Sequence, residues 1–171
     1  MPFNISSPTQ KYNLKNIRAI IVDARYVFSR DHNGLTLIPP SLISFAETFQ
    51  SDLRDLGHDI PLFTALQVED NSLFVTVSRQ PHEFLDAAGR PTSEGYELNI
   101  SPRSVTLTGA SPLGVWWGTR TLLQQAVLGN FEVPIGQGID APAWGERGMM
   151  VGKINCYRTF LIFVLTSHSL T

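Results

Sequence analysis

Three short segments in the middle of the chain alternate polar and apolar residues. They are residues 72–78 (Ser-Leu-Phe-Val-Thr-Val-Ser), 96–101 (Tyr-Glu-Leu-Asn-Ile-Ser) and 104–108 (Ser-Val-Thr-Leu-Thr). A period of two is typical of β-strands with one buried face. Pro102 and Arg103 separate the last two segments and favour a hairpin. Because an earlier β-branched run at residues 17–22 predicts a further strand, the pattern indicates a mostly antiparallel sheet with one solvent-exposed face.

A helical pattern of apolar residues follows the predicted strand at residues 17–22. Apolar residues recur at steps of three and four, at Leu42, Phe45, Ala46, Phe49, Leu53 and Leu56. The segment begins after Pro39-Pro40-Ser41, and Gly57 stands where a helix would stop. These residues predict an amphipathic helix with one buried face.

A second helix is predicted from Ser111-Pro112 to Leu128, with Gly129-Asn130 ending it. Its apolar residues surround the helix instead of forming one stripe, so one face can cover the sheet and another needs a second partner. Gly114 and Gly118 each cost about 1 kcal/mol relative to alanine in a helix interior. We therefore expect another backbone to approach them closely, either within this domain or from a domain that docks against it.

These elements predict an α+β fold in which a mostly antiparallel sheet is covered by two main helices. Residues 17–132 form the predicted domain. Residues 1–16 are expected to be extended or disordered. Residues 133–143, rich in Gly and Pro, are expected to be a linker.

Composition excludes several classes of partner and site. The 171 residues carry a net charge of -2 without charged blocks, so neither nucleic acid nor a membrane is an expected partner. The spacing of the four histidines does not indicate a metal site, and no cofactor is expected. Cys156 is the single cysteine, which excludes an intramolecular disulfide. The first ten residues do not form a secretory signal, and localisation stays open.

Two segments fit the acceptor sequence for N-linked glycosylation, Asn4-Ile5-Ser6 and Asn99-Ile100-Ser101. The second is followed by Pro102 and lies in a predicted strand. Neither segment settles the compartment.

Two motifs carry a family resemblance. Residues 110–125 contain Ala-Ser-Pro-Leu-Gly and Thr-Leu-Leu-Gln, and residues 144–151 read Trp-Gly-Glu-Arg-Gly-Met-Met-Val. Together they resemble the junction between the N-terminal accessory domain and the catalytic barrel in β-N-acetylhexosaminidases of glycoside hydrolase family 20, fungal type. The resemblance implies that residues 144–151 are a remnant of the first barrel strand. Because a (β/α)8 barrel needs roughly 250 residues, the catalytic barrel is expected to be missing.

The resemblance also implies a chemistry. The family removes terminal non-reducing N-acetylhexosamine with retention, and the substrate's own acetamido oxygen acts as nucleophile. An adjacent Asp-Glu pair assists this reaction, and this sequence contains no Asp-Glu dipeptide. We therefore expect no catalytic residue here. One site residue carries over by resemblance: Arg147 matches the barrel-opening arginine that hydrogen-bonds sugar hydroxyls, although its pocket would be incomplete.

After Val151 the family pattern stops, because Gly152 stands where the family has Asp. Residues 152–171 are interpreted as a non-family tail, with a retained intron or a mispredicted exon as the hypothesis. The tail contains the apolar run 160–165, which is too short to span a membrane and is expected to promote self-association.

The sequence therefore predicts a truncated β-N-acetylhexosaminidase-like protein that is inactive alone. Its expected partners are the missing catalytic barrel, as a docking partner, and, for the parent enzyme, glycans containing N-acetylglucosamine. The alternative is a free-standing carbohydrate-binding or protein-interaction module with the same accessory fold.

Overall fold

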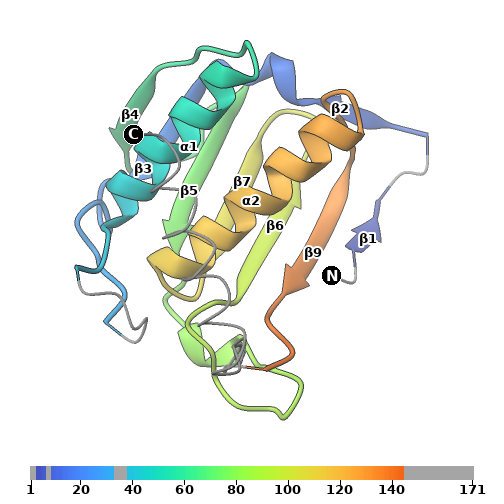
Figure 1. Ribbon diagram of the computed structural model, residues 1–171. Coiled ribbons are helices and arrows are strands. Elements are labelled where there is room, and N and C mark those ends of the chain that lie inside the picture. Colours follow the sequence, from blue (N-terminus) through green and yellow to red (C-terminus); the bar gives the residue numbers. More distant parts are fainter. Residues whose placement is uncertain (1–2, 7–8, 33–37, 145–171) are drawn as a thin grey trace, which may run out of the picture.

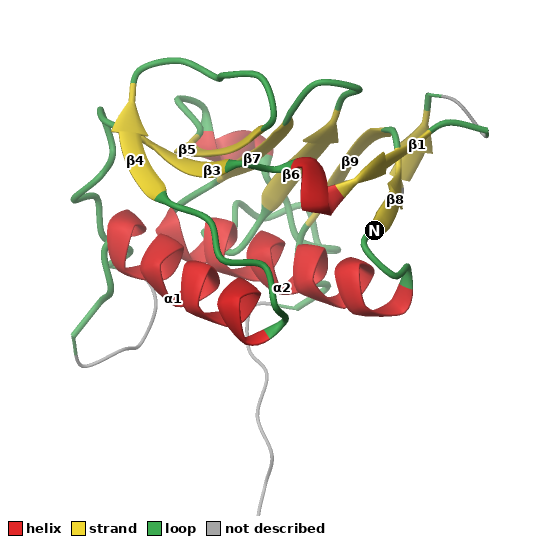
Figure 2. Cartoon of the chain, turned by 90° about the horizontal axis from the view of Figure 1, so that it is seen from above, coloured by secondary structure: helices red, strands yellow, loops and turns green. Residues whose placement is uncertain are grey.

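A single layer of two helices covers one face of a seven-stranded sheet in the computed structural model of the protein (Figures 1 and 2). The structure describes residues 3–6, 9–32 and 38–144. The other face of the sheet carries no helical layer in the described part (Figure 2). The predicted α+β class, with a sheet covered by two main helices, is confirmed.

The strand order across the large sheet is β1-β9-β6-β7-β5-β3-β4. These strands are β1 (Phe3–Ile5), β3 (Ala19–Asp23), β4 (Leu62–Ala65), β5 (Ser72–Val77), β6 (Tyr96–Ile100), β7 (Val105–Gly109) and β9 (Gly136–Asp140). A separate antiparallel pair is formed by β2 (Lys11–Asn13) and β8 (Glu132–Pro134). Two short 3-10 turns, Leu14–Asn16 and Pro81–Glu83, lie in connecting segments.

The large sheet is antiparallel at one end and parallel at the other. Neighbours run antiparallel from β1 to β7 and parallel from β7 to β4. Among the described strands of both sheets, antiparallel pairings outnumber parallel ones by four to three. The predicted hairpin of β6 and β7 is confirmed. Alternation did not reveal the parallel end, because it reports which face is buried and carries no information on strand direction.

Both ends of the described chain add strands that the sequence prediction missed. Residues 3–5 and 11–13 are extended, one of the two alternatives expected for residues 1–16, and they pair with β9 and β8 as ordered strands. Residues 132–140 form β8 and β9, so the expected linker was wrong there. Strands of three residues are too short to show a period, and the glycines of β9 hid its alternation. These strands extend the sheet and hold both ends against the domain.

Helix α1 (Leu42–Asp55) has the predicted amphipathic form. The Ser41 side chain accepts a hydrogen bond from the Ser44 backbone N–H at its start. Gly57 follows its end with a φ of +79°, a conformation that glycine adopts without strain. The helix lies between β3 and β4 in the chain, so it forms the crossover that parallel neighbours require.

Helix α2 (Pro112–Leu128) begins as predicted, with Ser111 accepting a hydrogen bond from the Leu113 backbone N–H. The core lies between the helices and the sheet. Its central residues, none more than 2% exposed, are Ile20, Val22, Leu73, Val75, Leu98, Leu107, Leu122 and Ala126. Alternate residues of the strands therefore form the sheet side of the core, and α2 contributes much of the helix side.

The two glycines of α2 allow this helix to lie very close to the sheet. A Cβ added at Gly114 would stand 2.1 Å from the backbone oxygen of Gly95. A Cβ at Gly118 would stand 2.2 Å from Cδ1 of Leu107. Close approach within the domain, one of the two explanations considered from the sequence, is therefore confirmed. The neighbour is a backbone at Gly114 and a side chain at Gly118.

We predict that Gly114→Ala lowers the free energy of unfolding by about 2 kcal/mol or more, because the added methyl meets backbone that cannot rotate away. Gly118→Ala is the matched control on the same helix. It should cost less, because the end of Leu107 can shift. Urea unfolding followed by circular dichroism measures both changes. An unchanged or increased stability of Gly114→Ala, as helix propensity alone would give, would contradict the close approach.

Candidate functional site

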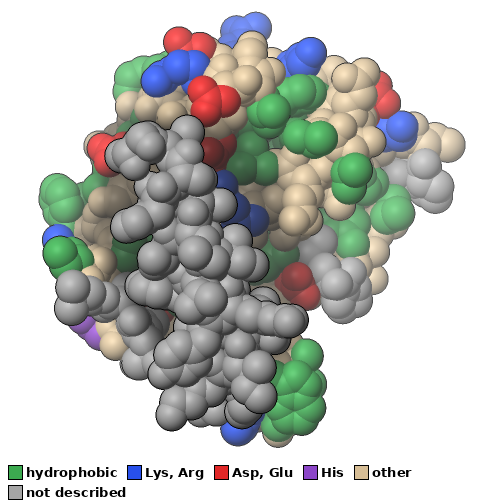
Figure 3. All heavy atoms as spheres, in the orientation of Figure 1, with side chains coloured by type: hydrophobic (Ala, Val, Ile, Leu, Met, Phe, Trp, Pro, Cys, Tyr) green, Lys and Arg blue, Asp and Glu red, His purple; other side chains and the backbone are tan. Residues whose placement is uncertain are grey.

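The outer face of α2, turned away from the sheet, exposes large apolar side chains together with the amides of Gln124 and Gln125. Trp117, Val127 and Leu128 are 39%, 61% and 84% exposed. In the space-filling view of this side, hydrophobic side chains gather over the C-terminal half of α2 (Figure 3). The outer face of α1 is different, because its exposed residues include Glu47, Thr48, Ser51, Arg54 and Asp55. The apolar outer surface is therefore centred on α2.

A stacked cluster joins the two helices at the edge of this face. The rings of Phe45 on α1 and Trp116 on α2 stack with centroids 5.2 Å apart. The Arg120 guanidinium lies 3.8 Å from the centroid of the Trp116 ring. On its other side Nη2 of Arg120 is 2.6 Å from Oδ2 of Asp52, an ion pair between the helices. The cluster fixes the relative position of α1 and α2 through aromatic and charged contacts.

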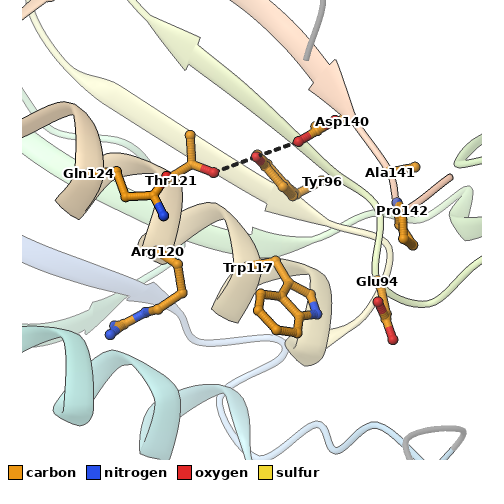
Figure 4. A pocket seen from close by; sticks show the side chains of 9 residues that line it. All are labelled: Glu94, Tyr96, Trp117, Arg120, Thr121, Gln124, Asp140, Ala141 and Pro142. Carbon is orange, nitrogen blue, oxygen red and sulfur yellow. Dashed lines mark hydrogen bonds between the residues drawn. The ribbon is translucent and has the colours of Figure 1, made fainter. Parts of the chain in front are cut away.

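A pocket of about 320 Å³ opens between α2 and the ends of β6 and β9 (Figure 4). Its polar and aromatic lining comprises Glu94, Tyr96, Trp117, Arg120, Thr121, Gln124 and Asp140. Ala141 and Pro142 complete the wall where the chain leaves β9. A neighbouring groove of about 410 Å³ shares Tyr96 and Asp140 and has an apolar floor that includes Leu98. Together they flank the side of α2 that α1 does not cover.

Tyr96 connects the sheet to α2 at the bottom of the pocket. Its hydroxyl donates to Oδ2 of Asp140 at 2.9 Å and lies 2.6 Å from the Thr121 hydroxyl (Figure 4). The side chain is buried, with 3% of the residue exposed. Burial is the main cause that raises the pKa of Tyr96 to about 12, and the negative charge of Asp140 acts in the same direction. Tyr96 is therefore a neutral hydrogen-bond donor at ordinary pH.

Asp23 is a buried carboxylate at the end of β3, and its contacts are structural. Arg25 donates from Nη2 to Oδ2 at 2.6 Å, and the Thr76 hydroxyl donates to the same oxygen at 2.6 Å. Burial alone would raise the pKa of Asp23, but the hydrogen bonds from Arg25 and Thr76 outweigh it and lower the pKa. The carboxylate thus ties β3 to β5 and to the segment after β3.

Among the residues that it describes, the structure does not bring the candidate binding and metal-ligating residues of the sequence together into one site. Arg147 lies outside the described residues. Within the part of the chain that the structure describes, no cluster of three His, Cys, Asp or Glu side chains is placed to hold a metal ion. No described helix is long and apolar enough to cross a bilayer. Sequence reasoning missed the pocket, because Asp140 lay in the expected linker. The available signal was the β-branched Ile139 followed by the carboxylate of Asp140.

Comparisons with known proteins point to one family. The family model described as glycosyl hydrolase family 20, domain 2, matches residues 30–134. Lacto-N-biosidase of Bifidobacterium bifidum is 36% identical over 55 residues, which cover 32% of this chain and 5% of that protein. The chain therefore spans a small part of this relative's length.

A solved structure with a TM-score above 0.5 shows the same fold. The GH20 β-N-acetylhexosaminidase from Streptomyces coelicolor A3(2) matches with a TM-score of 0.51 and 19% identity, over 84% of this chain and 26% of that one. The N-acetyl-β-hexosaminidase of Streptomyces plicatus, in complex with Thio-NAglucal, matches with a TM-score of 0.45 and 19% identity, over 84% of this chain and 30% of that one.

We predict that Tyr96 stays protonated well above the pH at which an ordinary tyrosine titrates, near 10. Because the folded pKa of about 12 exceeds the unfolded one, its contribution to stability is complete below about pH 10 and is lost as the pH rises towards 12. Tyrosinate absorbance at about pH 11 should therefore be equal in the wild type and in Tyr96→Phe. Circular dichroism at the same pH is the control that both proteins remain folded. A clearly smaller absorbance in Tyr96→Phe would show that the buried hydroxyl titrates normally.

Proposed function

We propose that this chain, which belongs to glycosyl hydrolase family 20 by the match of that family's domain 2, supports the catalytic barrel of a β-N-acetylhexosaminidase. The observation that carries this proposal is the apolar outer face of α2, beside the polar outer face of α1. A helix that is apolar on its sheet side and on its outer side needs a partner on both. The barrel is the partner that this family provides.

The chemistry of the α2 face suits a permanent interface. Tryptophan and arginine are the residues that most often dominate binding at protein interfaces, and Trp116, Trp117 and Arg120 lie within one turn of each other. Arg120 is already held against Trp116 and Asp52, so little side-chain freedom remains to be lost on docking. We infer that the barrel covers this cluster and the exposed Trp117.

The domain limits follow from this role. We propose that residues 3–140 form the supporting domain, that residues 141–143 lead to the barrel, and that residues 144–151 begin its first strand. Residues 152–171 are proposed to lie outside the family pattern. Arg147 would then hydrogen-bond hydroxyls of the non-reducing sugar once the rest of the barrel is present.

The parent activity proposed is the removal of terminal N-acetylhexosamine with retention, by the substrate-assisted route. That route needs an acid that protonates the departing oxygen, and proton transfer of this kind accounts for about 10² to 10⁴-fold of the rate. The sequence carries no Asp-Glu pair to supply it. The chain alone is therefore proposed to be inactive.

A second candidate function is carbohydrate binding, and the pocket beside α2 is the observation that favours it. An indole, two carboxylates and an amide line a space of about 320 Å³, from Trp117, Glu94, Asp140 and Gln124. Protein pockets for small ligands combine apolar walls with a few polar groups in this way. The pocket also lies where the chain leaves β9, so a docked barrel would cover it.

We predict that the purified chain hydrolyses a chromogenic N-acetylglucosaminide no faster than buffer does, because the proton donor is absent. Turnover that follows this chain through two unrelated purification steps would contradict inactivity. Calorimetry with chitobiose distinguishes the two candidates on the same sample. The support role gives no binding, whereas an affinity that Trp117→Ala abolishes would favour the carbohydrate-binding module.

We predict that the isolated domain self-associates through the uncovered α2 face. In a chain shortened to end at Val151, replacing Trp117 and Leu128 by Gln should reduce the apparent mass in size-exclusion chromatography with light scattering. The matched control replaces Phe63 and Ile139, 56% and 50% exposed on the opposite side of the sheet, and should leave the mass unchanged. Equal effects of the two pairs, or a monomeric parent, would be inconsistent with docking on α2.

A further inference from the structure

The face of the sheet opposite the helices is mainly polar at its antiparallel end, with Ile139 exposed among polar side chains. Along β6, Tyr96, Leu98 and Ile100 are buried under the helices, and Asn99 between them is exposed on the other face. Gln137 of β9 and Asn4 of β1 are exposed as well. At this end of the sheet, the strand residues that alternate with the buried ones include polar side chains that are exposed to solvent.

These three amides lie in one row across the strands. Asn99 is the register partner of Gln137, and Gln137 is the register partner of Asn4. Register partners in antiparallel strands point to the same face, so all three project away from the helices. With strands about 4.8 Å apart, the backbones of Asn4 and Asn99 are about 10 Å apart.

Both asparagines at the ends of this row begin the same tripeptide, Asn-Ile-Ser. No other asparagine in the 171 residues has Ser or Thr two positions later. The two asparagines thus fall on one face of one sheet, the face that carries no helical layer in the described part of the chain. We propose that this face is glycosylated in a chain that enters a eukaryotic secretory pathway, with Asn4 as the acceptor.

The chemistry is a group transfer to the side-chain amide. Nδ2 of Asn4 attacks C1 of the reducing-end N-acetylglucosamine of a lipid-diphosphate-linked oligosaccharide. The C–O bond to the diphosphate breaks, the lipid diphosphate leaves, and Nδ2 gives up one proton. The enzyme and its donor act on the extended chain, so the fold has to tolerate the product without supplying the catalyst.

The residue that follows each tripeptide distinguishes Asn4 from Asn99. Pro102 follows Ser101 and restricts that serine to an extended backbone. Ser6 is exposed and is not followed by proline. The two sites share the tripeptide and the face of the sheet, but only the serine at Asn99 is restricted by a following proline.

The structure leaves room for a glycan at Asn4. Asn4 lies on β1, the edge strand of the large sheet. On the same side, the loop between β4 and β5 arches near the parallel end of the sheet, far from β1 (Figure 2). The glycan would leave from the face opposite α2, so it would not interfere with a domain docked on the helices. A bulky, hydrated group beside an open edge strand also hinders pairing with another chain.

The test is to secrete the full chain from a eukaryotic host behind a cleavable leader and to measure intact mass before and after peptide-N-glycosidase. We expect a glycosidase-sensitive mass that Asn4→Gln abolishes. Ser6→Ala, which keeps the asparagine and removes the serine hydroxyl that the acceptor sequence requires, should abolish the glycosidase-sensitive mass as well. Asn99→Gln is the matched control on the same face and should retain it.

Peptide mapping of the wild type gives an answer that does not depend on any variant, because the glycosidase leaves Asp in place of a modified Asn. Asp at position 4 supports the proposal. A mass unaffected by glycosidase, or modification confined to Asn99, overturns it. Neither result bears on the α2 face, because the docking proposal is tested by self-association and not by the covalent mass of the chain.

Discussion

The close contact of α2 with strands β6 and β7 is the constraint on which the rest of the structure depends. It is possible because Gly114 has no side chain where the Gly95 carbonyl approaches, and because Gly118 leaves room for Leu107. This contact brings Thr121 within hydrogen-bond distance of the Tyr96 hydroxyl. It also sets which residues of α2 are left facing outward. Packing inside the domain therefore determines the surface that the domain offers to a partner.

The molecule has two faces with opposite properties as a consequence. The helix face carries aromatic and aliphatic groups on α2, and the sheet face at the antiparallel end carries amides and hydroxyls. The alternation of the strands enforces this division, because a slip by one residue would exchange the buried and exposed sets completely. A partner domain on the helices and a modified, solvated sheet surface are therefore compatible within one chain.

The sequence was most informative where periodicity and capping residues act together. Both helices were predicted: the second from its capping serine, Ser111, and the first from its apolar period after Pro39-Pro40-Ser41, where the structure shows Ser41 as the cap. The hairpin was predicted from alternation around Pro102. The strands at the ends of the sheet were missed, because three residues cannot display a period and Gly136 and Gly138 interrupt the pattern of β9.

The candidate site was harder to predict, for a related reason. Its residues come from β6, α2 and the end of β9, which are brought together only by the sheet order. Tyr96 and Asp140 are 44 positions apart, and nothing in their local sequence indicates that they meet. The sequence located α2 correctly, but it did not show that the adjacent residues Trp116 and Trp117 have different surroundings. Trp116 packs between Phe45 and Arg120, whereas Trp117 lines the pocket.

The charge on α2 completes the argument for docking. Arg120 is the one charged residue among the 17 of this helix, and it is paired with Asp52 of α1. An unpaired guanidinium at the centre of an interface would oppose docking, because burying a lone charge is costly. A pair already formed presents no net charge to the partner, and its attraction strengthens as water is excluded. The ion pair between the helices therefore makes an otherwise apolar surface suitable for burial, and α1 contributes to docking although its own outer face is polar.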